Sequence, residues 1–303
     1  LADLQKKNLI RTNAGINLND FAVFYRTHAQ SRALEESFLN NSIPYRIIGG
    51  VSFYERREIK DIVSYLRLVY NPSDMVSLNR IINVPSRGIG QTIVSRIKDL
   101  NGILDIMENL NSFDQRTAKN LGLFIDLYKK MQDKSNEESV FELISSIIKI
   151  TNYKDYLLDG TSEGETRWEN VKELLSVAKR FENLAPRESL ESFLHDVSLV
   201  SDLDNQDYKK EAVSLMTLHS AKGLEFDYVF MVGMEEGIFP HSQSFDDHNQ
   251  LEEERRLCYV GATRARKKLY LIYANSRLLY GGIQSNVSSR FIDEMPQNVI
   301  KYS

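Results

Sequence analysis

The spacing of hydrophobic residues divides the chain into two β-containing regions separated by a helical one. Runs rich in β-branched and aromatic residues mark expected strands at Phe21–Tyr25 and Tyr45–Ile48, and later at Val213–Thr217, 228–232 and 268–273. Helical patterns alternate with these strands, which is typical of a parallel α/β sheet. We therefore predict one sheet of about five strands, to which both ends of the chain contribute.

Helical segments are marked by apolar residues that recur every three or four positions. After the second expected strand such a pattern runs for about three turns and stops before Pro72, which cannot continue a helix. Another helix is expected at 251–261, between the last two strands. The first pattern consists of Ile59, Ile62, Val63, Leu66, Val69 and Tyr70.

The middle of the chain, from about 105 to 205, has helical spacing and no convincing strand. We therefore expect an all-helical domain inserted into an α/β domain, with boundaries at 1–105, 106–205 and 206–303. The residues that carry the spacing are Leu121, Phe124, Leu127 and Tyr128, then Phe141, Ile144, Ile147 and Ile148, and then Val171, Leu174, Leu175 and Ala178.

Composition excludes several classes of protein. The net charge of −4 argues against a bulk binder of polyanions, so any nucleic-acid contact must use a local groove. Cys258 is the only cysteine, which excludes an internal disulfide and a cysteine-rich zinc site. We expect no metal site, no membrane segment and a cytoplasmic setting. Because the chain opens with Leu1 and has no leader pattern, we expect it to begin inside a longer protein.

Three segments carry candidate chemistry, and the first follows a predicted strand. Ligands of open α/β sheets bind beyond the carboxyl ends of the strands. Tyr25 is placed there to stack on a base, and Arg26 to fork onto a phosphate. A partly buried tyrosine and a surface arginine are the alternative reading.

The second segment follows the strand at Val213–Thr217. Thr217, His219 and Lys222 form a polar loop suited to a phosphodiester backbone, and Gly223 lets the main chain approach a ligand closely. Glu225 is placed to accept hydrogen bonds from a ribose hydroxyl. The alternative is that the histidine of this loop is structural.

The third segment, 252–265, ends a predicted helix. Residues 252–256 have a plain interpretation as a solvated helix face with local ion pairs. Gly261 and the small residues after it end the helix and present Arg264 on a short turn. An arginine presented in this way suits the stabilisation of charge on a transferring phosphoryl group.

Together the three segments resemble motifs IV, V and VI of the UvrD/PcrA/Rep family of superfamily 1 helicases. The matching letters are YRT at 25–27 with AQSR at 29–32, TLH at 217–219 with KGLEF at 222–226, and YVG at 259–261 with TRA at 263–265. INVP at 82–85, RGIG at 87–90 and EEGIFPH at 235–241 are similar to further family segments. The departures are His28, where the family has Asn, and Ala262, where it has Ile.

The resemblance implies a RecA-like sheet domain called 2A and a helical insertion called 2B, which swivels and touches duplex DNA. It implies that Tyr25 stacks on adenine, that Arg26 and Arg264 reach the γ-phosphate of ATP, and that Glu225 binds the ribose. It implies movement along single-stranded DNA in the 3′ to 5′ direction. It implies that the path of single-stranded DNA is lined by Arg87, His219 and His241, with Asn83 and Thr217 as weaker candidates.

A phosphate cradle of the form G-x-x-x-x-G-K-[ST] is absent from the sequence. By the resemblance, ATP and Mg²⁺ would be held by a preceding domain 1A, and this chain alone would hydrolyse no ATP. The implied partners are single-stranded DNA, a single-strand/duplex junction, the protein's own 1A and 1B domains, and repair or replication proteins. No membrane partner is expected.

Alternatives remain open at this point. One is a non-catalytic module of the same fold that binds nucleic acid or a partner, and another is a subunit of a nuclease-linked recombination enzyme. The turn at Gly88–Gly90 either meets DNA phosphates or only shapes the chain before a helix, and the insertion is either structural or a mobile regulator. From the sequence, the motor interpretation depends on Arg26 and Arg264 meeting at one edge of the sheet and pointing at the same nucleotide, and guanidinium groups on opposite sides of the domain would count against it.

Overall fold

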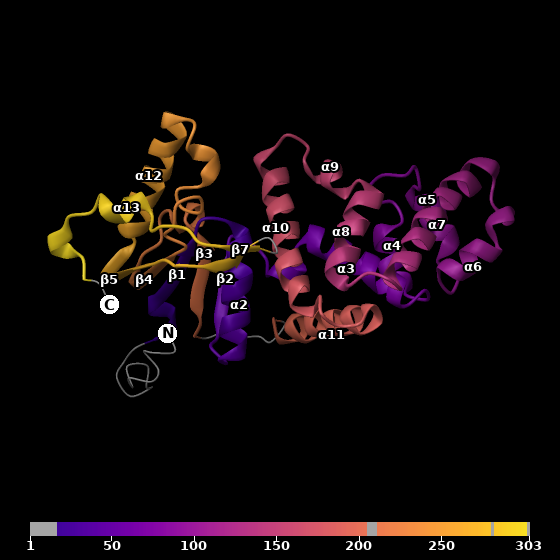
Figure 1. The fold of residues 1–303 in the computed structure, drawn as a ribbon, viewed down its shortest axis with the longest axis horizontal. Helices are drawn as coiled ribbons and strands as arrows, with labels where there is room; N and C mark the ends of the chain where they lie inside the picture. Colours follow the sequence, from indigo (N-terminus) through magenta and orange to yellow (C-terminus); the bar gives the residue numbers. More distant parts are fainter. Residues whose placement is uncertain (1–16, 205–210, 280–281, 302–303) are drawn as a thin grey trace. The chain divides into compact units, whose positions relative to one another are not determined.

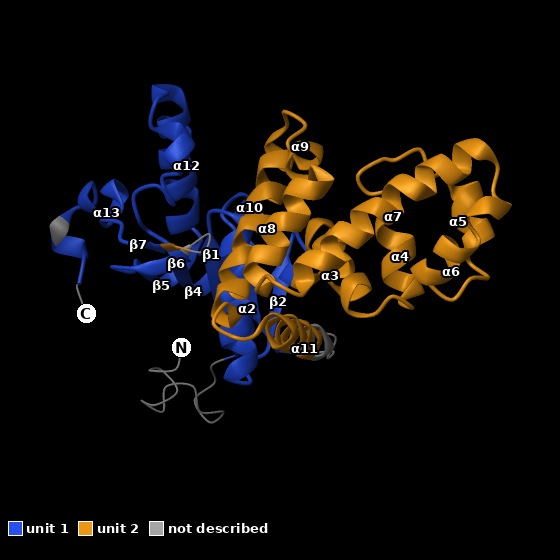
Figure 2. Cartoon of the chain, turned by 45° about the vertical axis from the view of Figure 1, so that its right-hand side comes forward, with its two compact units in different colours: residues 1–53, 202–278, 283–303 blue, residues 54–201, 279–282 orange. Residues whose placement is uncertain are grey.

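A computed structural model describes residues 17–204, 211–279 and 282–301. The chain divides into two compact units, coloured separately in Figure 2: unit 1 comprises residues 1–53, 202–278 and 283–303, and unit 2 comprises residues 54–201 and 279–282. The expectation about Leu1 concerns residues outside the described ranges.

The first boundary between the units lies after Phe53, not near residue 105 as the sequence suggested. The segment from 54 to 105 is helical and packs with the helices that follow it, so it belongs to the insertion. The second boundary, at 201/202, lies close to the expected one. Helical spacing identified the first helix of this segment correctly but carries no information about which core the helix joins.

Unit 1 is built on a five-stranded parallel sheet of order β2-β3-β1-β4-β5, which confirms the predicted α/β fold (Figure 1). Residue Ala22 lies beside Ser214 on one side and Val229 on the other, so strands from both ends of the chain alternate. The strands are β1 (Phe21–Tyr25), β2 (Tyr45–Ile48), β3 (Val213–Thr217), β4 (Phe226–Val232) and β5 (Ala265–Ile272); β6 (Arg277–Leu279) and β7 (Gly282–Gln284) form a separate pair.

Each face of the sheet has its own hydrophobic core. Alternate residues of β1 point to opposite faces, so Phe24 joins one cluster and Val23 joins the other. The Phe24 cluster includes Cys258 of α12 (His248–Ala262) and Phe291 of α13 (Arg290–Asp293). The Val23 cluster includes Phe38 of α2 (Ser31–Asn40). β1 and β3 are buried at every position, which explains why these two central strands are mostly apolar.

Residues 54–201 of unit 2 form helices joined by turns and loops, with no strand. The apolar spacings singled out in the sequence fall on α3, α7, α8 and α10, which confirms the helical insertion. No helix among the described residues of either unit is both long enough and apolar enough to cross a membrane. The helices are α3 (Arg57–Tyr70), α4 (Met75–Ile81), α5 (Gln91–Ile97), α6 (Ile103–Glu108), α7 (Gln115–Ser135), α8 (Val140–Thr151), α9 (Tyr153–Leu157), α10 (Ser162–Ala178) and α11 (Pro186–Asp204).

A polar network is buried inside unit 2. The carboxylate of Asp61 accepts hydrogen bonds from Arg80 Nε and from the hydroxyl of Tyr153, each at 2.7 Å. Burial, together with the charge of Asp61, raises the pKa of Tyr153 far above its ordinary value, so the hydroxyl keeps its proton. Beside it, Asn170 accepts from Arg56 at 2.9 Å and donates to Glu58 at 2.6 Å. These contacts tie α3 to α4, α9 and α10.

Candidate functional site

The carboxyl edge of the sheet in unit 1 gathers polar segments from several strands. Because the strands are parallel, the residues after β1, β2, β3 and β4 all emerge at this edge. Leu218 donates its backbone N–H to the carbonyl of Tyr25 at 2.9 Å, which joins the exits of β1 and β3. Gly49, after β2, has φ +76°, and a Cβ there would lie 2.6 Å from Ser220 Oγ. The segments are therefore in close contact.

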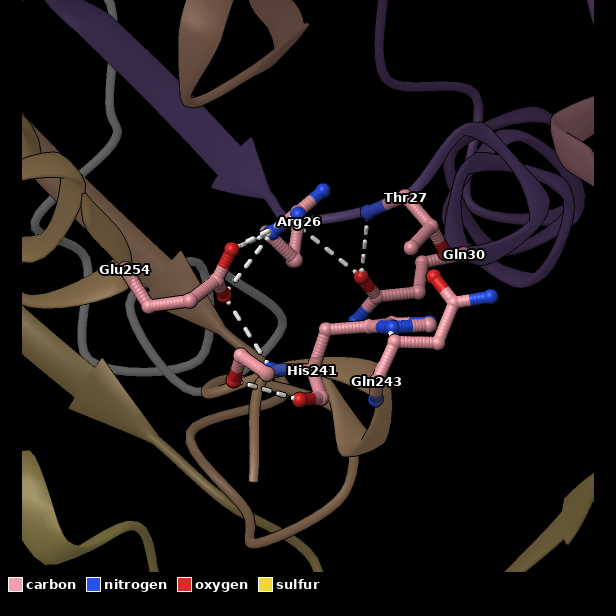
Figure 3. Close-up of polar contacts among 7 residues, drawn as sticks. Arg26, Thr27, Gln30, His241, Gln243 and Glu254 are labelled. Atoms are coloured by element: carbon pink, nitrogen blue, oxygen red, sulfur yellow. Dashed lines mark hydrogen bonds and ion pairs between the residues drawn. The ribbon is translucent and has the colours of Figure 1, made fainter. Parts of the chain in front are cut away.

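Arg26 is the central cation of this edge (Figure 3). It follows β1 directly, and its guanidinium forms a two-pronged ion pair with Glu254 of α12. Nε lies 2.9 Å from both carboxylate oxygens, and Nη2 lies 2.7 Å from one of them. The Glu254 side chain is buried, so the pair is well shielded from water.

Gln30 braces the backbone on which Arg26 sits. Its side-chain oxygen accepts hydrogen bonds from the N–H groups of Arg26 and Thr27, both at 2.9 Å. Gly233, with φ +71°, makes room for it, since a Cβ at that position would lie 2.1 Å from Gln30 Nε2. A side chain at 233 would therefore displace the brace.

His219 and Thr217 occupy the exit of β3. Thr217 is buried, and its hydroxyl lies 3.0 Å from Ser220 Oγ, so its side chain shapes the turn. His219 is exposed at the surface of this turn. Desolvation by the surrounding protein, and then the positive charge of Arg26, lower the pKa of His219 below its ordinary value of 6.5. The imidazole is therefore neutral at pH 7.

This lowered pKa predicts a dependence of stability on pH. The folded chain resists protonation of His219 more than the unfolded chain does, so the associated stability is present above pH 6.5 and lost as the pH falls below it. We expect the Tm to fall as the pH is lowered below 6.5, and to fall less in His219→Gln. Thermal melts of both proteins across this range test it; equal slopes would contradict it.

His241 reaches the same edge from β4. Its backbone N–H donates to Glu254 Oε2 at 3.1 Å, so one carboxylate joins this turn to Arg26. Two acids anchor the segment before it. Glu235 is fully buried and accepts the N–H of Ala274 at 2.8 Å and the guanidinium of Arg277.

Glu236 binds the guanidinium of Arg290 through both carboxylate oxygens, Oε1 to Nε and Oε2 to Nε and Nη2. Burial opposes the charge of Glu236, but the hydrogen bonds from Arg290 outweigh it and lower its pKa. Glu235 and Glu236 therefore anchor the turn that carries His241. His241 itself is partly exposed.

Arg264 does not lie at this edge, so the expectation that it shares one edge with Arg26 is wrong. Arg26 follows β1, whereas Arg264 precedes β5, which runs parallel to β4. Through the registers of β1, β4 and β5, the two positions differ by about eight residues, or roughly 25 Å along the strands. A residue after one parallel strand and a residue before another lie at opposite edges.

The amino edge instead brings Arg264 together with Glu225, whose neighbour Phe226 donates its N–H to the Arg264 carbonyl at 2.9 Å. The guanidinium of Arg264 bonds the carbonyls of Val260 at 2.9 Å and Leu224 at 3.3 Å. Glu225 pairs with Arg266 at 2.9 Å, and both side chains are more than half exposed. This exposed pair leaves the carboxylate of Glu225 accessible to a ligand.

Tyr25 and Arg87 have more enclosed positions than the sequence suggested. Tyr25 is fully buried in the Val23 cluster, so its ring is not accessible to an adenine in this structure. The side-chain direction follows from strand alternation, which places Tyr25 on the same face as Phe21 and Val23.

Arg87 lies in unit 2, where it bonds the carbonyl of Ile81 at 2.9 Å and the hydroxyl of Tyr65 at 2.6 Å. Its guanidinium also lies over the Phe124 ring, 5.4 Å from the centroid. The side-chain oxygen of Asn83 accepts the N–H of Arg87 at 2.7 Å and that of Ile89 at 3.2 Å. Asn83 and Arg87 therefore shape a turn in unit 2. The other residues expected to contact single-stranded DNA, namely Thr217, His219 and His241, lie in unit 1.

Glu254 and Gln30 belong to this site, although the sequence patterns did not single them out as functional residues. Glu252 and Glu253 do form the expected local pairs, with Arg255 and Arg256. Glu254 instead shares the buried face of α12 with Cys258 and Gly261, at spacings of four and three residues. That spacing was the available signal that this one acid points inward.

Comparison with known proteins agrees with this architecture. A family model for the UvrD-like helicase C-terminal domain matches residues 3–276. The chain is 43% identical over 299 residues to the ATP-dependent DNA helicase PcrA of Bacillus subtilis (strain 168), a match that covers 94% of the chain and 40% of the relative. It is 41% identical over 303 residues to the PcrA of Staphylococcus aureus (strain Mu50 / ATCC 700699), covering 95% and 41%.

Both relatives are PcrA helicases, which confirms the resemblance of the three motif segments to the UvrD/PcrA/Rep family. Among the members of that family, the motifs look most like those of PcrA. The chain spans about two fifths of the length of the curated relatives it matches. On the family match and these identities, the chain belongs to the UvrD-like helicase C-terminal domain family.

Proposed function

We propose that this chain is the C-terminal motor portion of an ATP-dependent DNA helicase that moves 3′ to 5′ on single-stranded DNA. In this proposal unit 1 is domain 2A, and unit 2 contains domain 2B. The observation that carries it is the Arg26 guanidinium, held at the carboxyl edge beside His219 and His241 in a chain of this family. A cation suited to phosphate thus lies beside groups suited to a DNA backbone.

Arg26 is the stronger candidate for the γ-phosphate, because its guanidinium is oriented and only partly buried. Arg264 and Glu225 share the amino edge, about eight residues along the strands from Arg26, so we do not propose that Arg264 reaches the same γ-phosphate. The proposal rests on Arg26 and on the family match, and not on two arginines that meet. Adenine stacking by Tyr25 would require the ring to leave the core, so we give it no role in this conformation.

His219 and His241 are the proposed contacts to single-stranded DNA in unit 1, with Thr217 supporting the turn. Asn83 and Arg87 are proposed to hold a second contact surface in shape, because Asn83 Oδ1 and several Arg87 donors are already bonded within unit 2. No group of three His, Cys, Asp or Glu side chains within the described ranges is arranged to hold a metal ion, so we assign Mg²⁺ no ligand here.

The test compares this chain with the full-length protein that contains it. We expect the chain alone to show no ATP turnover, because the sequence holds no phosphate cradle. We expect the full-length protein to hydrolyse ATP when single-stranded DNA is added and to unwind duplexes with a 3′ single-stranded tail. DNA binding without turnover by the full-length protein would instead indicate a non-catalytic module.

A further inference from the structure

The guanidinium of Arg26 is held by one side only. Its Nε and Nη2 donate to Glu254, whereas Nη1 makes no hydrogen bond within the described part of the chain. An arginine has five N–H donors in a planar fork, so the side opposite the carboxylate keeps donors for another anion. Figure 3 shows the carboxylate placed against this single side.

Glu254 is itself held rigidly. It lies on the buried face of α12, one turn before Cys258 and two turns before Gly261. A Cβ on Gly261 would lie 2.5 Å from Leu218, which shows how closely the helix packs against the exit of β3. Because Oε2 also accepts the N–H of His241 at 3.1 Å, the carboxylate has little freedom to rotate.

From these contacts we propose that Glu254 is a positioning residue. It binds Nε and Nη2 of Arg26, and so orients the opposite side of the guanidinium toward a nucleotide phosphate. The same carboxylate fixes the His241 turn, so it links the proposed phosphate contact to the proposed DNA contact. This inference rests on the proposed function, because it needs Arg26 to touch the nucleotide. Glu254 itself touches no substrate.

The experiment is a double-mutant cycle in the full-length protein, read as DNA-stimulated ATPase. We expect Glu254→Gln to lower kcat about tenfold and to change the KM for ATP by less than about threefold, because a misaligned guanidinium mainly weakens the transition state. Added to Arg26→Ala, Glu254→Gln should cause no further loss, since its effect passes through Arg26. Glu254→Asp should recover part of the rate.

Two results would overturn the proposal: a wild-type kcat in Glu254→Gln, or losses that multiply in the double variant. Glu253→Gln is the matched control, because it removes an adjacent exposed acid whose ion-pair partner, among the residues that the structure describes, is Arg256 of the same helix. If circular dichroism shows that Glu254→Gln is poorly folded, Glu254→Asp replaces it in the cycle. A wild-type kcat in Glu254→Asp, or losses that multiply when Arg26→Ala is added, would then overturn the proposal. If Arg26→Ala alone leaves the ATPase intact, the proposed function fails, whereas a loss confined to Arg26→Ala removes only the role of Glu254.

Discussion

Arg26→Ala is expected to lower the DNA-stimulated ATPase of the full-length protein about a thousandfold, the scale associated with an arginine that stabilises a transferring phosphoryl group. The guanidinium is oriented by Glu254 at the carboxyl edge, so its removal takes away an aligned charge rather than a mobile one. Steady-state kinetics with saturating single-stranded DNA would measure the loss. Arg26→Lys should recover little, because an ammonium cannot reproduce the planar fork.

Arg256→Ala is the control for this experiment, since Arg256 lies on α12, is exposed and, within the described ranges, forms an ion pair with Glu253 alone. Its ATPase should stay within about twofold of the wild type. The substitution Arg26→Ala leaves the buried Glu254 without its cation. Circular dichroism is therefore needed to show that the variant is folded. A rate for Arg26→Ala similar to that of Arg256→Ala would exclude Arg26 from the chemistry.

Asp61→Ala is expected to lower the free energy of unfolding of unit 2 by about 2–3 kcal/mol. The substitution removes the acceptor of the Tyr153 hydroxyl, which is fully buried, and the carboxylate partner of Arg80. Arg80 is about one third exposed and can turn toward water, which limits the cost. Trp168 is the only tryptophan and lies in α10, so its fluorescence in a urea titration reports on unit 2.

Asp126→Ala serves as the comparison, because Asp126 is an exposed acid on α7 of the same unit. It should change the free energy of unfolding by no more than about 0.5 kcal/mol. Asp61→Asn, which keeps an oxygen acceptor, should fall between the two. If Asp61→Ala unfolds at the wild-type urea concentration, the buried network contributes no net stability to unit 2.

Most of the strands were predictable because they are short runs rich in β-branched and aromatic residues, whereas β5 contains Arg266, Lys267 and Lys268 and begins before the predicted 268–273. β1, β2 and β3 begin and end where the hydrophobic pattern does, and α12 extends only a few residues beyond the predicted 251–261. Burial on both faces of a parallel sheet makes this signal strong. The helices of unit 2 were found for a related reason, since their apolar faces repeat every three or four residues.

Arrangements that depend on long-range packing were not predictable in the same way. The pattern of α3 shows a helix but not that Asp61 and Glu58 bond residues of α9 and α10. The turn before Arg264 was recognised, yet which edge it occupies depends on the direction of β5. Arg87 was expected to face DNA, but only the folded unit shows that Tyr65 and Phe124 surround its guanidinium.

The nested connectivity of the two units has a consequence for synthesis on the ribosome. β1 and β2 are synthesised before residues 54–201 of unit 2, but their partner β3 follows this segment, so the nascent sheet cannot close until the helical insertion has been translated. The helices of unit 2 are contiguous in sequence and rich in local contacts, which favours rapid folding. We expect unit 2 to fold first, while the apolar β1 segment waits exposed and depends on chaperones.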